Sequence, residues 1–134
     1  MIALPHVRVS TFDADRLERV IAWHGGPEAE RLEEELMRAE VIAVAAVPPT
    51  LVTMNSRVRY RDQTTGEEHA ITLVFPHDAD ASCGKVSIMA PIASALLGLV
   101  VGDEIDWPMP GGRTTRLRVL AIVYQPEAAG DFHR

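Results

Sequence analysis

The chain has 134 residues, 47% of them hydrophobic and 24% charged, which excludes a disordered or fibrous protein and leaves room for one compact domain with a small appendage. Its formal net charge of -6 argues against a nucleic-acid-binding face over much of the surface, because phosphate binding needs clustered lysine and arginine. The apolar stretches are too short for a membrane span of about 20 residues, and the start has no secretory signal pattern, so we expect a cytoplasmic protein.

The first predicted element is an amphipathic helix that ends near Trp23. Ser10 or Thr11 can cap it, and Asp13 places a negative charge in the first turn, where the helix dipole favours an acid. An apolar stripe at i, i+3, i+4, i+7 spacing predicts one packed face. That stripe consists of Leu17, Val20, Ile21 and His24.

A glycine pair followed by a proline predicts that the chain turns back into a second helix. Gly25 and Gly26 can adopt φ > 0, and Pro27 suits the first position of a helix. The second helix is expected to end at Pro48-Pro49 and to present a near-heptad seam to the first. That seam consists of Ala29, Leu32, Leu36, Ala39 and Ala43. Residues 1–49 are therefore predicted to form an antiparallel helical hairpin, a short coiled coil.

From residue 50 to residue 134 the pattern changes to short β-strands, which indicates a second unit. The predicted strands are 52–61, 69–75, 85–89, 104–107 and 114–124. Turn residues at 64–67 and 110–112 predict β-hairpins, so the sheet should be mostly antiparallel. Residues 92–97 predict a short helix that ends at Gly98, and the residues after Tyr124 are interpreted as a tail. The predicted fold class is α+β.

Four segments of the second unit carry a family resemblance. They are VTMNSRVRYRD (52–62), TLVFP (72–76), VSIMAPIASALLGLVVGDEIDWPMPGG (86–112) and VLAIVYQPEAAGDF (119–132). In this order they resemble the Rnk family (regulator of nucleoside diphosphate kinase), which is related to the GreA/GreB transcription elongation factors. The resemblance is close from Val52 onward and covers the N-terminal hairpin in outline. It implies an FKBP-like, mostly antiparallel sheet domain with a short helix, preceded by an antiparallel helical hairpin.

The resemblance further implies a bacterial regulator that binds RNA polymerase and is not an enzyme, with DNA or RNA contacted only through the polymerase. In Gre factors the sheet domain docks on the rim of the polymerase secondary channel, the pore through which nucleotides enter. The loop at that docking surface matches Met89, Ala90, Pro91 and Ile92, which are therefore the expected partner contacts. The family's name records a genetic effect on nucleoside diphosphate kinase, from which we do not infer kinase binding.

The predicted hairpin tip departs from the Gre factors that stimulate transcript cleavage. Those proteins hold a pair of acids at the tip of a long hairpin, where the acids help to bind a catalytic Mg²⁺. Here the turn has no adjacent acidic pair, and the tip consists of His24, Gly25, Gly26, Glu28 and Glu30. A first helix of about 11 residues spans about 16 Å, so the tip should not reach the polymerase active centre. We expect competition with Gre-type factors without stimulated cleavage.

Two other functions stay open from the sequence. The first is a peptidyl-prolyl isomerase, because FKBP-like folds host that activity, with Phe75 and Trp107 as the plausible liners of a proline pocket. The second is a Gre-like cleavage cofactor that uses Glu28 and Glu30. An isomerase assay and a transcript-shortening assay separate these hypotheses from the leading one.

The sequence has no motif that predicts a catalytic residue, a metal site or a cofactor. Residues 77–84 begin like a calcium loop, but Cys83 stands where the loop needs glycine and Met89 where it needs glutamate. The five histidines lack metal-ligand spacing, and Cys83 as the single cysteine can form no internal disulfide.

Arginines alternate along two predicted strands, and we favour a solvated sheet face balanced by Glu67 and Glu68 over a surface for an acidic region of the polymerase. These arginines are Arg57, Arg59, Arg61, Arg113, Arg116 and Arg118. We expect a monomer, although apolar residues at positions 42, 44 and 47 either pack on the sheet unit or support self-association.

Overall fold

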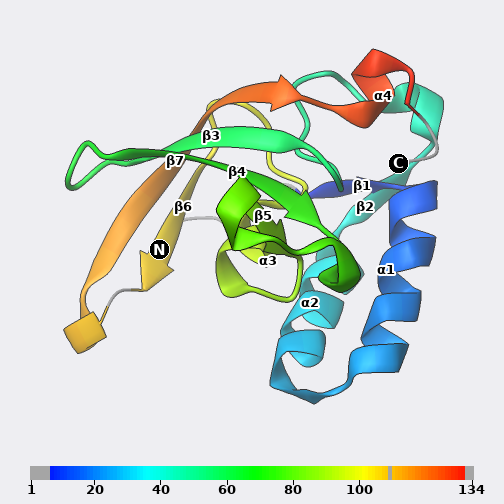
Figure 1. Cartoon of the computed structure of the whole chain (residues 1–134), viewed down its shortest axis with the longest axis horizontal. Coiled ribbons are helices and arrows are strands. Elements are labelled where there is room, and N and C mark those ends of the chain that lie inside the picture. Colours follow the sequence, from blue (N-terminus) through cyan, green and yellow to red (C-terminus); the bar gives the residue numbers. More distant parts are fainter. Residues whose placement is uncertain (1–6, 109, 132–134) are drawn as a thin grey trace.

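The computed structural model describes residues 7–108 and 110–131, and it has the α+β architecture that the sequence predicts. Two antiparallel helices extend to one side of a curled β-sheet, and their connecting tip points away from the sheet (Figure 1). Within the described residues no helix is long and apolar enough to cross a membrane.

The helical hairpin begins and turns as predicted. Helix α1 (Thr11–His24) has Ser10 as its N-cap, and the Oγ of Ser10 accepts a hydrogen bond from the backbone N–H of Asp13 at 3.0 Å. Gly25 and Gly26 both have positive φ angles, of 65° and 87°, and helix α2 (Gly26–Arg38) follows at once. The two helices therefore lie side by side with a minimal connection.

The second helix is shorter than predicted, because it ends at Arg38 and does not continue to the proline pair. Ala39 is already extended, with φ -77° and ψ 146°. The next residues form strand β2 (Glu40–Ile42), which pairs in parallel with strand β1 (Arg8–Ser10), and the backbone N–H of Glu40 donates to the carbonyl of Val7 at 2.8 Å. The prediction that Ala39 and Ala43 belong to a helical seam is therefore wrong, and a pairing between distant segments replaces it.

The sheet unit contains the five predicted strands in the order β5-β4-β3-β7-β6, counted among the described residues. Neighbouring strands are antiparallel except for the β4–β5 pair, which is parallel. The bounds are β3 (Arg57–Asp62), β4 (Glu68–Val74), β5 (Lys85–Ser87), β6 (Glu104–Pro108) and β7 (Thr114–Tyr124). Residues 52–56, predicted as strand, form a buried irregular segment before β3.

Helix α3 (Pro91–Leu96) packs against the sheet and also contacts α2, so the hairpin and the sheet unit share their interior. Leu17 of α1 and Leu32 of α2 are fully buried in the same cluster as Leu73 of β4 and Leu96 of α3. Burial of each such leucine side chain contributes about 1.5–3 kcal/mol. The direction of the helical hairpin is therefore fixed by apolar packing as well as by the pairing of β1 with β2 at its base.

The segment after β7 is structured up to Asp131, which corrects the prediction of a tail. Gln125 is 4% exposed, and its side-chain amide donates to the carbonyls of Pro48 and Leu51 at 2.8 and 2.7 Å. Helix α4 (Pro126–Ala129) follows, capped by the Gln125 side chain. The last three residues of the predicted tail, 132–134, lie outside the described residues.

Candidate functional site at the base of the hairpin

The loop predicted to contact a partner connects β5 to α3. Its backbone is held by a turn in which the N–H groups of Met89 and Ala90 donate to the Oγ and the carbonyl of Ser87, at 3.1 and 2.9 Å. Pro91 is exposed in the first turn of α3, whereas Ala90 and Ile92 are half-buried. Met89 is 8% exposed and belongs to the core, so its role is to shape the loop more than to present a surface.

The loop and the hairpin tip lie on different parts of the molecule. The tip residues predicted from the sequence, His24, Gly25, Gly26, Glu28 and Glu30, are all exposed at the far end of the hairpin, and Glu28 lies in the first turn of α2 (Figure 1). The helix dipole favours an acid at that position. In the residues that the structure describes, no three side chains of His, Cys, Asp or Glu cluster so as to hold a metal ion.

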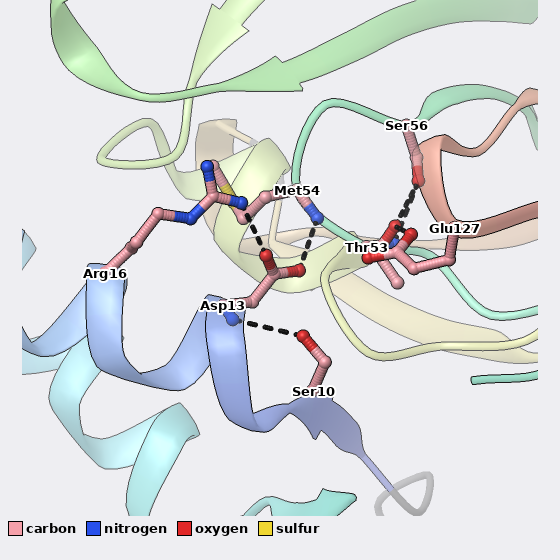
Figure 2. A network of polar contacts seen from close by, with 7 residues as sticks. All are labelled: Ser10, Asp13, Arg16, Thr53, Met54, Ser56 and Glu127. Atoms are coloured by element: carbon pink, nitrogen blue, oxygen red, sulfur yellow. Dashed lines mark hydrogen bonds and ion pairs between the residues drawn. The ribbon is translucent and has the colours of Figure 1, made fainter. Parts of the chain in front are cut away.

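A buried carboxylate fixes the base of the hairpin against the sheet unit (Figure 2). Asp13 is 1% exposed, and its Oδ2 accepts a hydrogen bond from the backbone N–H of Met54 at 3.1 Å. Its Oδ1 accepts from the guanidinium of Arg16 at 2.7 Å. Desolvation raises the pKa of the Asp13 carboxyl above its ordinary value of 3.8, although the bonds to Arg16 and Met54 oppose that rise.

Arg16 completes this junction from the exposed side. Its guanidinium lies over the ring of Phe12, 4.1 Å from the centroid, and over the ring of Phe75, 4.6 Å from the centroid. A guanidinium above an aromatic face is attracted by the ring quadrupole. The ion pair with Asp13 and these two rings together connect α1 to the end of β4.

The segment that receives the Asp13 bond is held from its other side by α4. The hydroxyl of Thr53 donates to Oε1 of Glu127 at 2.8 Å, and the backbone N–H of Thr53 donates to the Oγ of Ser56 at 3.0 Å (Figure 2). Residues 52–56 are thus connected to the first helix and to the last one. This arrangement determines where the hairpin lies relative to the sheet.

Close backbone packing joins β1 to the end of α3. Gly98 has a φ of 82°, and a Cβ atom at this position would lie 2.3 Å from Cγ1 of Val7 and 2.9 Å from the carbonyl oxygen of Arg8. The backbone N–H of Arg8 donates to the Gly98 carbonyl at 3.3 Å. The sequence predicted this glycine as a helix end, but its contact with β1 was not predicted.

The geometry gives little support to a proline-binding pocket. Phe75 follows β4 and is 6% exposed beneath Arg16, whereas Trp107 lies on β6. Strands β3 and β7 lie between β4 and β6, so about 14 Å of sheet separates the two side chains at about 4.8 Å per strand. The two aromatic rings therefore do not line a shared site.

Residues predicted as a calcium-like loop and as an arginine-bearing sheet face have local partners. Asp80 accepts hydrogen bonds from the N–H and the hydroxyl of Ser82 at 3.1 and 2.6 Å, and the Ser82 hydroxyl lowers the pKa of that carboxyl. Glu68 pairs with Arg59 and Arg61 across β3 and β4, as predicted. Glu67 instead pairs with His69.

Comparison with known proteins assigns both parts of the chain. Residues 5–42 match the family described as "Rnk N-terminus", and residues 47–124 match "Transcription elongation factor, GreA/GreB, C-term". The regulator of nucleoside diphosphate kinase of Escherichia coli K12 is 44% identical over 131 residues, which cover 96% of each chain. The chain belongs to the Rnk family.

Other relatives of this Rnk-family chain are named as transcription elongation factors. GreA of Sinorhizobium medicae is 37% identical over 99 residues, which cover 74% of this chain and 62% of GreA. A solved structure described as a GreA/GreB elongation factor from Nitrosomonas europaea has a TM-score of 0.74 and 49% identity, and covers 90% of this chain and 99% of that one. These relatives are regulators and transcription factors by name, and the chain is a regulator related to elongation factors.

Proposed function

We propose that this Rnk-family protein binds RNA polymerase at the rim of the secondary channel through the loop 89–92 and competes there with Gre-type factors. The supporting observation is the combination of a GreA/GreB C-terminal match over residues 47–124 with a short hairpin fixed at its base by Asp13. Pro91 is the exposed residue of the loop and is its main contact in this proposal. DNA and RNA are then contacted through the polymerase.

The hairpin length supports binding without stimulated cleavage. Helix α1 has 14 residues, three more than the sequence suggested, and spans about 21 Å at about 1.5 Å per residue. The hairpin tip has no adjacent pair of acids, because Glu28 lies in the first turn of α2 and is separated from Glu30 by Ala29. The proposed factor occupies the channel rim without placing carboxylates at the catalytic metal.

The two units have separate roles in this proposal. Residues 1–49 set the reach of the tip, and residues 50–134 dock on the polymerase. We infer a cytoplasmic monomer, in which the half-buried side chains of Ile42, Val44 and Val47 stay on the surface of a single copy. Analytical ultracentrifugation of the purified protein measures its molecular mass in solution and so tests whether it is a monomer.

Binding of the purified protein to core RNA polymerase tests the proposal directly. We expect saturable binding that Pro91→Ala weakens and that an added Gre factor displaces. Pro49→Ala is the matched control, because Pro49 is also an exposed loop proline but lies next to the end of β7. Lack of binding at micromolar concentration, or equal effects of the two proline variants, contradicts docking through this loop.

A further inference from the structure

Five arginines share one face of the sheet, on a chain that is acidic as a whole. The face that turns away from α3 carries Arg57, Arg59 and Arg61 of β3 and Arg116 and Arg118 of β7. Buried Val58, Leu117 and Val119 alternate with them and point into the core. These five residues, here named the arginine face, are five of the 13 basic residues in a chain of net charge -6.

Carboxylates on this face are fewer than the guanidinium groups. Glu68 is shared by Arg59 and Arg61, at 3.3 and 2.9 Å. Glu104 is shared by Arg116 and Arg118, at 3.4 and 3.6 Å. Asp106 adds a further contact to Arg116 at 3.2 Å. Each guanidinium has five N–H donors, so these three acids occupy a minority of the donors of the arginine face. Arg57 donates instead to Oγ1 of Thr72 at 3.3 Å.

The centre of the arginine face contains a like-charge pair. Arg61 and Arg118 are direct partners in the β3–β7 register, and their outer partners are Glu68 on β4 and Glu104 on β6. The order across four strands is thus acid, arginine, arginine, acid. Like charges directly opposite each other destabilise a sheet, whereas an anion placed between them is attracted by both. About half of each of these two side chains is exposed, so an anion can reach them.

The chemistry of the arginine face fits a protein carboxylate better than a nucleic acid. Guanidinium groups bind carboxylates through paired N–H donors, and arginine is preferred over lysine for such contacts. Nucleic acids bind sheet faces largely by base stacking on aromatic rings, whereas the half-buried rings of Tyr60 and Trp107 lie on the opposite face.

We propose that the arginine face docks an acidic segment of a partner protein, with carboxylates of that segment between Arg61 and Arg118. This surface is distinct from the loop 89–92 and does not depend on polymerase docking there. The binding is electrostatic, so it weakens as salt increases.

Titration of the full chain with a poly-L-glutamate peptide, followed by amide chemical shifts at low salt, tests this proposal. We expect saturable shifts at the β3 and β7 arginines. The double variant Arg61→Gln/Arg118→Gln should weaken binding roughly tenfold, because it removes two charged donors. It also removes the like-charge pair, so its thermal stability should not fall. Arg59→Gln/Arg116→Gln gives a second test in case the first pair disturbs folding.

Arg19→Gln is the matched control, because Arg19 is an exposed arginine on α1 that pairs with Asp15. It should bind the peptide as the parent chain does, and so should Pro91→Ala, which separates this surface from the polymerase loop. The proposal is overturned by shifts that do not saturate or that lie elsewhere, or by unchanged affinity in both double variants. It is also overturned if an oligothymidylate binds the arginine face as tightly as the peptide.

Discussion

The carboxylate of Asp13 accepts a hydrogen bond from the backbone N–H of Met54, 41 residues further along the chain. This bond joins the first turn of the hairpin to the segment that precedes the sheet (Figure 2). Asp13 and Met54 are each 1% exposed, so bulk water does not compete for this bond. The position of the hairpin tip relative to the sheet therefore depends on this buried acid, together with the apolar packing around it and the contacts of Arg16 and Thr53.

We expect Asp13→Ala to lower the free energy of unfolding by about 1–3 kcal/mol, because it leaves the buried N–H of Met54 without an acceptor. Chemical denaturation measures that change, and hydrogen exchange at the Met54 amide should accelerate. Asp15→Ala is the control, since Asp15 is an exposed acid on the same helix with a surface ion pair worth at most about 1 kcal/mol. Equal effects of the two substitutions contradict a special role for Asp13.

The raised pKa of Asp13 predicts a pH dependence of stability. In the folded chain this carboxyl binds its proton more tightly than at the ordinary value of 3.8, so the native state holds more protons than the unfolded state in that range. The contribution of Asp13 is therefore fully present below pH about 3.8 and is lost as the pH rises through the folded pKa. Asp62, Glu68 and Asp80 have lowered pKa values and act in the opposite direction.

Comparison with Asp13→Asn isolates this effect from that of the other acids. Asparagine keeps an acceptor for Met54 but does not titrate. The difference in unfolding free energy between the parent chain and the variant should therefore shift in favour of the variant as the pH rises from about 3 to about 7. Denaturation curves across that range provide the measurement. A difference that is constant with pH, or that shifts in favour of the parent, would show that the folded pKa is not raised.

Gly98→Ala should destabilise the chain by about 2–4 kcal/mol, because the new methyl group meets Val7 and the Arg8 carbonyl in addition to the strain of a positive φ. Gly66→Ala is a close control, with φ 79° and open space around the added Cβ atom. It should cost about 1 kcal/mol from backbone strain alone. Thermal unfolding of both variants tests the difference, and similar melting temperatures would argue against the tight contact between β1 and Gly98.

Gln125→Ala should lower the free energy of unfolding by about 2 kcal/mol, because the buried carbonyls of Pro48 and Leu51 lose their donor. Gln63→Ala changes an exposed glutamine and should have little effect. Urea denaturation compares the two. If Gln125 is as tolerant as Gln63, the segment after β7 is a tail as first predicted.

Added protein should leave RNA length unchanged in a backtracked polymerase complex, because the tip lacks an acidic pair that can hold a catalytic metal. Gel analysis of the transcript with and without the protein gives the answer, with a Gre factor as the positive control. Shortening that is abolished by Glu28→Ala or Glu30→Ala would replace this proposal with a cleavage cofactor. Shortening that persists in both variants would place the active acids elsewhere.

Local sequence patterns predict most of the elements of this fold. The Ser10 cap, the Gly25-Gly26 turn and the strand at residues 114–124 each depend on neighbouring residues, and all three are confirmed. Helix α2 was predicted too long because Ala39 and Ala43 continue a seam that is compatible with a helix. The pairing of β2 with β1 joins segments about 30 residues apart and overrides that local preference.

The residues at the hairpin base were harder to predict, since their roles depend on distant partners. Asp13 was interpreted as an acid that favours the positive end of the helix dipole. Ser10 and Asp13 also have the spacing of a capping box, which is one signal that the acid has a hydrogen-bonding role. Nothing local indicates that its partner is Met54. Gln125 was likewise assigned to a tail, because the last residues of a domain are commonly poorly ordered.

The parallel pairing of β1 with β2 holds the two ends of the helical hairpin together, because the chain enters and leaves the two helices through these adjacent strands. Equal insertions into α1 and α2 would move the tip outward by about 10 Å for every seven residues and leave the β1–β2 pairing unchanged. The length of the hairpin and its attachment to the sheet unit can therefore change independently in this architecture. Evolution can lengthen or shorten the arm of such a factor without rebuilding the surface that holds it in place.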